Sequence, residues 1–170
     1  RIIVATFASN IHRVQQIINV ANSLGRKVAI MGRSLENVVN ISAQLGYLDI
    51  PDNLLISGEL INRYPAEKLV IITTGSQGEP FSGLVLMSKG EHRQITLGER
   101  DLVAVFATPI PGNEKLVSNT INRLFAPEFR NRLDATVTFR NLNEDNIMPE
   151  AFNPAVAEAV SQAVKDHIRE

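Results

Sequence analysis

The strongest constraint on the fold of this chain is a repeated alternation of short apolar runs and helical patterns. Four runs rich in valine and isoleucine recur along the first two thirds: "RIIVATF" (1–7), "KVAIMG" (27–32), "KLVIITTG" (68–75) and "DLVAVFATP" (101–109). Each run is too short for a buried helix and has the composition of a strand that is covered on both faces. The pattern therefore predicts four strands of a buried sheet.

Between these runs, apolar residues recur at helical spacing. The first such pattern starts after Ser9 or Asn10 and ends at Gly25, the second follows Ser34, and a third covers residues 117–124. Small polar residues commonly begin a helix, and glycine commonly ends one. The alternation predicts an α/β fold, namely a doubly wound, mostly parallel sheet of the Rossmann-like type with helices on both faces.

The alternation of apolar runs and helical patterns does not continue after residue 125. The remaining segment offers one plausible strand, 135–139, and a final amphipathic helix, 154–168. Because 45 residues are few for an independent domain, we expect residues 1–125 to form the α/β domain. Residues 126–170 are then expected to add a strand and a C-terminal helix that pack on the same domain.

Composition narrows the possible classes of protein. The net charge of −1 gives no overall positive field, which argues mildly against an autonomous nucleic-acid binder. Without cysteine, the chain has no disulfide, thiolate metal site or cysteine nucleophile. No apolar run approaches the roughly 20 residues that span a bilayer, so we expect a cytoplasmic protein with no membrane partner. The chain opens directly on a strand at Arg1, which indicates a piece of a longer protein.

Small polar residues follow each predicted strand. Parallel strands end at the same edge of a sheet, and doubly wound folds bind ligands in the crevice beyond that edge. We therefore expect one rim to collect Ser9, Asn10, His12, Arg13, Arg33, Ser34, Thr74, Ser76, Gln77 and Asn113.

The loop "TTGSQGEP" (73–80) has the features of an anion site. Gly75 and Gly78 permit close backbone approach, which would leave N–H groups facing an anion, and Pro80 can start the next helix. Phosphate is the natural ligand, although an ordinary strand-to-helix turn explains the loop equally well. Arg13 and Arg33 would suit a phosphodiester beside two helix starts, or serve only as surface charges.

Several familiar catalytic motifs are missing. The chain has no GxxxxGK[ST] loop, no GxGxxG after the first strand and no GxSxG elbow, so a P-loop ATPase or a dinucleotide oxidoreductase is disfavoured. Three isolated histidines, His12, His92 and His167, cannot build a closed zinc site. His12 suits contact with a phosphate or a metal-bound substrate, but an exposed position in the first helical turn is at least as plausible.

Four stretches together carry a resemblance to a known family: "IVATFASNIHRVQQII", "GRKVAIMGRSLENVV", "LVIITTGSQGEPFSGL" and "ATPIPGNEKLVSNTINRLF". In these stretches, residues 1–125 closely resemble part of the beta-CASP domain of bacterial ribonuclease J, a nuclease of the metallo-beta-lactamase superfamily. Their order and spacing make the match far more specific than a single glycine loop.

The resemblance implies an RNA-processing hydrolase that acts at the interface of two domains. The metallo-beta-lactamase domain of such enzymes carries two zinc ions through an HxHxDH motif, and the beta-CASP domain contacts the RNA backbone and 5′-terminal phosphate. The implied partners are therefore single-stranded, 5′-monophosphorylated RNA and that metal domain. By position, the resemblance places these residues against the RNA: Ser9, Asn10, His12, Arg13, Gly75, Ser76, Gln77, Gly78 and Glu79.

The departures from the family pattern bear on activity. HxHxDH is absent, as are later segments of the SGHA and PVHGE kind, so we expect no catalytic residue, no metal cofactor and no hydrolysis by this chain alone. In the tail, "PEFRNRLD" (127–134) is similar to the arginine-finger segment of Clp-type AAA+ unfoldases, with the finger at Arg132. Residues 144–168 look like the C-terminal region of bacterial malic enzymes. These short matches indicate a composite chain, and the alternative is an unusual family member.

The sequence thus leaves three hypotheses. The leading one is an RNA-backbone and 5′-phosphate-binding module of a ribonuclease J-like enzyme. The second is a Rossmann-like module that binds a nucleotide or a sugar phosphate in the same crevice. The third is a folded scaffold that retains no activity.

Overall fold

The computed structural model describes residues 1–98 and 100–124 of the chain. These residues form five strands, four α-helices and two short 3₁₀ helices. In chain order the elements are β1 (Ile2–Ala5), α1 (Ile11–Ser23), β2 (Lys27–Met31), α2 (Arg33–Gln44), β3 (Leu55–Ile56), η1 (Gly58–Arg63), η2 (Ala66–Lys68), β4 (Leu69–Thr73), α3 (Gly83–Lys89), β5 (Leu102–Val105) and α4 (Glu114–Leu124).

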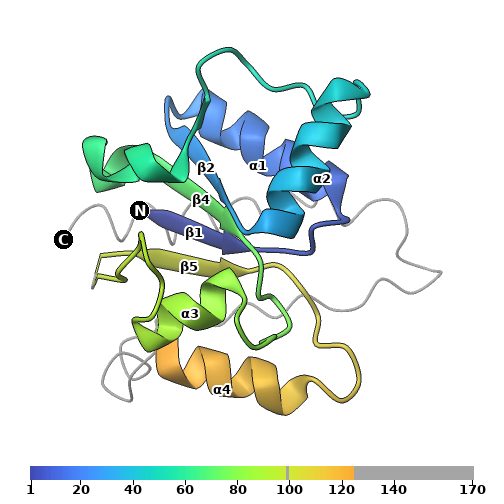
Figure 1. Ribbon diagram of the computed structural model, residues 1–170, viewed down its shortest axis with the longest axis vertical. Coiled ribbons are helices and arrows are strands. Elements are labelled where there is room, and N and C mark those ends of the chain that lie inside the picture. Colours follow the sequence, from blue (N-terminus) through green and yellow to red (C-terminus); the bar gives the residue numbers. More distant parts are fainter. Residues whose placement is uncertain (99, 125–170) are drawn as a thin grey trace, which may run out of the picture. The chain divides into compact units, whose positions relative to one another are not determined.

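The strands form one sheet in the order β3-β2-β4-β1-β5, and all of its pairings are parallel. In register, Ile2 of β1 lies beside Val70 on one side and Leu102 on the other. Helices α1 and α2 cover one face of the sheet, while α3 and α4 lie on the opposite face (Figure 1). The predicted doubly wound α/β fold is therefore confirmed, with β3 as a short additional strand.

Buried apolar side chains hold helices to both faces of the sheet. Successive strand residues point to opposite faces, so each central strand supplies both layers. The layer under α1 and α2 contains Val4, Val14, Ile18, Ala21, Val28, Leu35, Val39, Leu48, Leu54, Val70 and Ile72. The layer on the other face contains Ile3, Ala5, Ala29, Met31, Ile61, Leu69, Ile71, Leu84, Met87 and Ile95. Each large side chain buried in this way contributes about 1.5–3 kcal/mol, which fixes the position of the strand ends.

The first helix starts where the sequence predicts, and the second starts earlier. The Asn10 side chain caps α1 by accepting a hydrogen bond from the Arg13 backbone N–H at 3.1 Å. Helix α2 begins at Arg33 after Gly32, so the expected start after Ser34 is wrong. Gly32 has a φ of 114°, which turns the chain straight from β2 into the helix.

The start of α3 also differs from expectation. Pro80 does not begin this helix, which starts at Gly83 with Ser82 as its cap. Between them, Phe81 has a φ of 66°, and a left-handed residue interrupts a right-handed helical backbone. Pro80 and Phe81 therefore belong to an extended loop after β4.

Several predictions concern residues that the structure does not describe. The strand at 135–139, the helix at 154–168 and the packing of segment 126–170 lie outside the described residues and stay predictions. Among the helices that are described, none is long and apolar enough to cross a membrane.

A partly buried ion pair joins the start of β1 to the turn before β5. The Arg1 guanidinium contacts Asp101 through Nε–Oδ1 at 2.9 Å and Nη2–Oδ2 at 2.6 Å. The Gly98 N–H also donates to the Asp101 carboxylate at 2.8 Å. Burial works to raise the pKa of Asp101, but these hydrogen bonds and the nearby positive charge together outweigh it and hold the pKa below its ordinary value. The ionised carboxylate is therefore the form that stabilises this turn.

This lowered pKa predicts a loss of stability in acid. The stabilisation is fully present above the ordinary pKa of 3.8 and is lost as the pH falls through the lower folded-state pKa. We expect Asp101→Asn to reduce the free energy of unfolding at pH 7 by about 1.5 kcal/mol, because asparagine keeps an acceptor but loses the charge. Urea denaturation at pH 7 and pH 3 measures both effects.

The exposed Asp52 provides the matched control. Asp52→Asn should leave the free energy of unfolding at pH 7 nearly unchanged and should keep the same acid-dependent loss as the parent chain. Asp101→Asn should lose less stability than the parent between the two pH values. An equal loss in both variants would contradict the assignment of this acid sensitivity to Asp101.

Candidate functional site

All four predicted strand exits open at the same edge of the sheet. The connections after β1, β2, β4 and β5 follow strands that pair in parallel, so they leave from the carboxyl edge together. This convergence, expected from the sequence, is confirmed. Asn113 lies in the fourth connection, just before α4, and every other predicted binding residue belongs to one of the first three connections or to the helix that follows it.

One hollow lies at the point where the sheet reverses its winding. Strands β1 and β4 are neighbours, but β1 leads to α1 on one face and β4 leads to α3 on the other. Such a switch point is the common ligand site of doubly wound folds. We call this hollow of about 310 Å³ the switch-point pocket, lined by Thr6, Phe7, Ala8, Ser34, Thr74, Gly75, Glu79, Pro80, Phe81 and Ser82.

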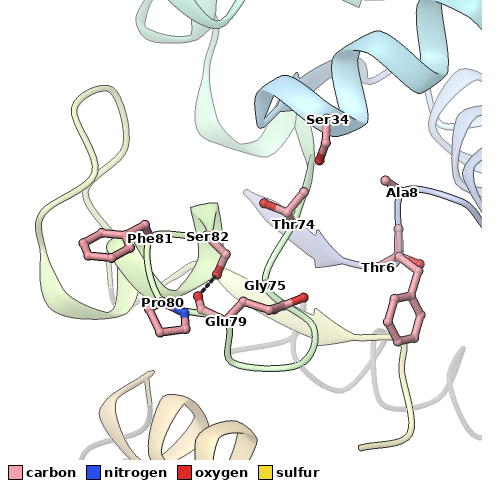
Figure 2. Close-up of a pocket in the computed structure, with 10 residues that line it drawn as sticks. Thr6, Ala8, Ser34, Thr74, Gly75, Glu79, Pro80, Phe81 and Ser82 are labelled. Atoms are coloured by element: carbon pink, nitrogen blue, oxygen red, sulfur yellow. Dashed lines mark hydrogen bonds between the residues drawn. The ribbon is translucent and has the colours of Figure 1, made fainter. Parts of the chain in front are cut away.

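Three elements of the chain contribute the polar lining of the switch-point pocket. Figure 2 shows Ser34, from the first turn of α2, close to Thr74, which directly follows β4. On another side, Glu79 and Ser82 come from the loop before α3, where the Ser82 hydroxyl donates to the Glu79 carbonyl at 2.6 Å. Thr6 completes the ring from the exit of β1.

A second hollow lies at the start of α1. We call it the helix-start pocket, with a volume of about 510 Å³ and a lining of Phe7, Ser9, Asn10, Ile11, His12, Ser42 and Tyr47. Phe7 lines both pockets, so the two hollows are neighbours. Only part of the predicted set lines these hollows, with Ser9, Asn10 and His12 in this one and Ser34, Gly75 and Glu79 in the other.

The two predicted arginines do not gather around a common anion. The Arg13 guanidinium donates to the Phe106 carbonyl, which ties α1 to the segment after β5. Arg33 is exposed at the first position of α2. Neither residue lines either pocket, so the expected guanidinium pair is not found.

The "GSQGE" loop is held by contacts within the protein. Ser76 and Gln77 are only 2% exposed. The Gln77 side chain donates to the Thr108 carbonyl at 3.0 Å and accepts from the Ile110 N–H at 2.7 Å. These bonds fasten the loop after β4 to the segment before α4. The prediction that these two side chains face a phosphate therefore lacks geometric support.

Two backbone N–H groups of this loop also have partners within it. The Gln77 N–H donates to the Glu79 carboxylate at 3.1 Å, and the Gly78 N–H donates to the Gly75 carbonyl at 3.0 Å. These two N–H groups are therefore already bonded within the protein. A carboxylate at this position also repels a phosphate, so Glu79 is unsuited to the phosphate contact that the family resemblance implies.

Close packing accounts for the glycine at position 78. A Cβ there would lie 2.5 Å from the Leu116 carbonyl carbon in α4, a distance that real side chains essentially never show. Glycine is required because α4 packs directly on the loop backbone. The loop therefore holds α4, and the ligand-accessible surface lies beside it in the two pockets.

Some residues that line the two pockets were not predicted from the sequence. Thr6, Phe7 and Phe81 line pockets, and Phe81 is 85% exposed with its ring pointing away from the other lining residues in Figure 2. An aromatic residue inside a glycine-rich loop was the available signal for Phe81. Within residues 1–98 and 100–124, no group of three or more His, Cys, Asp or Glu side chains is placed to hold a metal ion.

Comparisons with known proteins identify the same family as the sequence motifs. The sequence matches the family described as "Ribonuclease J, beta-CASP domain" over residues 1–124. Ribonuclease J2 of Bacillus subtilis is 44% identical over 124 residues, which are 73% of this chain and 22% of that protein. Ribonuclease J of Mycolicibacterium smegmatis is 47% identical over 124 residues, which are again 73% of this chain and 22% of that protein. Ribonuclease J of Helicobacter pylori is 44% identical over 128 residues, 75% of this chain and 19% of that protein.

The match covers only part of the relatives and only part of this chain. The chain spans about a fifth of the length of these relatives. The family match ends at residue 124, so the tail resemblances to Clp-type unfoldases and malic enzymes, including the Arg132 finger, receive no support from it. The match covers residues 1–124, which are more than two thirds of the chain, and on that ground the chain belongs to the ribonuclease J beta-CASP domain family.

Proposed function

We propose that this domain binds the backbone and 5′-terminal phosphate of single-stranded RNA as part of a ribonuclease J-like, RNA-processing hydrolase. The observation that carries the proposal is the convergence of Ser9, Asn10 and His12 on the helix-start pocket. The pocket adjoins the N-terminal end of α1, whose backbone dipole favours a negative group. Hydroxyl and imidazole groups add hydrogen-bond donors for phosphate oxygens.

The proposal extends to a partner domain and its cofactor. The hydrolytic step requires a metallo-beta-lactamase domain with two zinc ions, which would activate the attacking water. The role of the present domain is then to hold the RNA, and we expect no hydrolysis by the chain alone. A cytoplasmic location is part of the same proposal.

Direct binding measurements test this function. Fluorescence anisotropy with a 3′-labelled, single-stranded RNA should give a dissociation constant about tenfold lower for the 5′-monophosphate form than for the 5′-hydroxyl form. Ser9→Ala combined with His12→Ala should remove this preference, because the phosphate loses two donors. Affinity should also fall as salt rises, since phosphate contacts release counterions.

A matched control separates phosphate binding from helix stability. Ser23→Ala lies at the opposite end of α1, where the serine hydroxyl donates to the Val20 carbonyl one turn earlier, and should leave the preference intact. Equal affinity for both RNA forms in the parent chain would contradict the 5′-phosphate assignment. Tight binding of a free mononucleotide with no RNA binding would favour the second hypothesis, a module for a nucleotide or sugar phosphate.

A further inference from the structure

Two side chains from different connections bind the backbone of the same segment. We call residues 106–110 the β5–α4 segment, which begins directly after β5. The Arg13 guanidinium, from α1, donates to the Phe106 carbonyl. The Gln77 side chain, from the loop after β4, donates to one carbonyl of the segment and accepts from one of its N–H groups. The segment therefore links the start of α1 to the loop after β4, which lie at the same end of the sheet (Figure 1).

Arg13 holds the start of α1 at two points. Its backbone N–H donates to the side chain of Asn10, the cap of the helix, at 3.1 Å. Its guanidinium is half-buried and has no ion-pair partner among the described residues, so its charge goes into the bond to the Phe106 carbonyl. A hydrogen bond from a charged donor is stronger than a neutral one. Ser9, Asn10 and His12, which adjoin Arg13, line the helix-start pocket.

Gln77 binds the β5–α4 segment without access to a ligand. It is 2% exposed and lines neither pocket. At the other end of the segment, the Phe106 N–H donates to the Ala5 carbonyl of β1 at 2.9 Å. The segment is thus fixed by β1, by Arg13 and by Gln77. Binding groups are held in productive geometry by such supporting contacts, and a displacement of about 1 Å weakens them strongly.

We propose that Arg13 and Gln77 are positioning residues for the phosphate contact at the helix-start pocket, and that they act through the backbone of the β5–α4 segment without touching the RNA. This inference rests on the proposed RNA-binding function. It gives the two residues a role different from the direct RNA contact that the family resemblance implies. It also accounts for the absence of both residues from the pocket linings.

Fluorescence anisotropy with the full chain and 3′-labelled RNA tests the positioning role. Arg13→Met and Gln77→Leu should each reduce the expected tenfold preference for the 5′-monophosphate form to about threefold or less. The double variant should lose no more than the larger single loss, because both side chains act through one segment. A full 5′-phosphate preference in Gln77→Leu would overturn the proposal.

Salt dependence separates positioning from direct contact. If Arg13 bound an RNA phosphate, Arg13→Met would weaken the binding of both RNA forms and reduce the salt slope by about 1. A positioning residue adds no phosphate contact of its own, so Arg13→Met and Gln77→Leu should both keep the salt slope of the parent for 5′-hydroxyl RNA. A slope reduced in Arg13→Met alone would overturn the positioning role of Arg13.

Asp101→Asn is the control for a general loss of stability. This variant weakens the ion pair with Arg1, which precedes β5 at the opposite end of the strand. It should keep the full 5′-phosphate preference. An equal loss of preference in Asp101→Asn and Gln77→Leu would overturn the proposal. Circular dichroism at the assay temperature verifies that each variant is folded.

Nuclear magnetic resonance distinguishes failure of this inference from failure of the proposed function. Gln77→Leu should shift the amide signals of Asn10 to Arg13 and leave those of Asn19 to Ser23 unchanged. Equal affinity of the parent chain for both RNA forms would reject the phosphate assignment, and these shifts would still support the link between the segment and the start of α1. Unchanged signals of Asn10 to Arg13 would overturn the positioning inference, whatever the RNA preference of the parent.

Discussion

Gly78→Ala should lower the free energy of unfolding by about 3 kcal/mol. Two costs add at this position. Gly78 has a φ of 70°, which disfavours any residue with a Cβ, and the new Cβ would lie 2.5 Å from the Leu116 carbonyl carbon and 2.6 Å from its oxygen. Because the obstacle is the backbone of α4, the helix itself must move. Urea denaturation followed by circular dichroism measures the loss.

Gly90→Ala separates these two costs. Gly90 has a φ of 72°, nearly the same as Gly78, but a Cβ there would meet nothing within 4 Å. This control variant should lose about 1 kcal/mol from backbone strain alone. The difference between the two variants then measures the close approach of α4. Equal losses would contradict direct packing of α4 on the loop.

Gln77→Leu should cost about 2–3 kcal/mol, although leucine has a similar volume and is apolar. The substitution removes the bond that Gln77 donates to the Thr108 carbonyl and the bond that it accepts from the Ile110 N–H. Both bonds reach more than thirty positions along the chain, so their loss should loosen the segment before α4. Urea denaturation gives the energy, and amide hydrogen exchange at Ile110 reports the local opening.

Two further variants define this effect. Gln44→Leu changes an exposed glutamine at the end of α2 and should alter stability by less than about 0.5 kcal/mol. Gln77→Glu keeps an acceptor for Ile110 but turns a carboxylate oxygen toward the Thr108 carbonyl, so it should be at least as destabilising as leucine. Unchanged hydrogen exchange at Ile110 in Gln77→Leu would show that other contacts hold this segment.

Local patterns in the sequence predict most of the described fold. Strand-like runs, a helix cap at Asn10 and the common edge of the exits all depend on residues close together in the chain. The start of α3 was missed because the left-handed φ of Phe81 is imposed by the folded loop and has no local signature. A bulky residue at such a φ is rare, so the default expectation was a helix beginning at Pro80.

The internal contacts of the glycine-rich loop could not be predicted from the sequence for a related reason. Its motif resembles an anion-binding turn, but Gly78 and Gln77 are explained by α4 and the segment before it, more than thirty residues away. Contacts between residues so far apart in the chain cannot be predicted from a local sequence pattern. The division of the carboxyl edge into two pockets likewise depends on Phe7, which has no motif of its own.

The strand order has a consequence for synthesis of the protein. Both hydrogen-bonded neighbours of β1, namely β4 and β5, come much later in the chain. A nascent chain that ends before residue 69 therefore exposes the isoleucine-rich first strand with two unsatisfied edges, a known route to aggregation. Emergence of β4 from the ribosome is thus the event that first gives β1 a partner and brings the two halves of the sheet together.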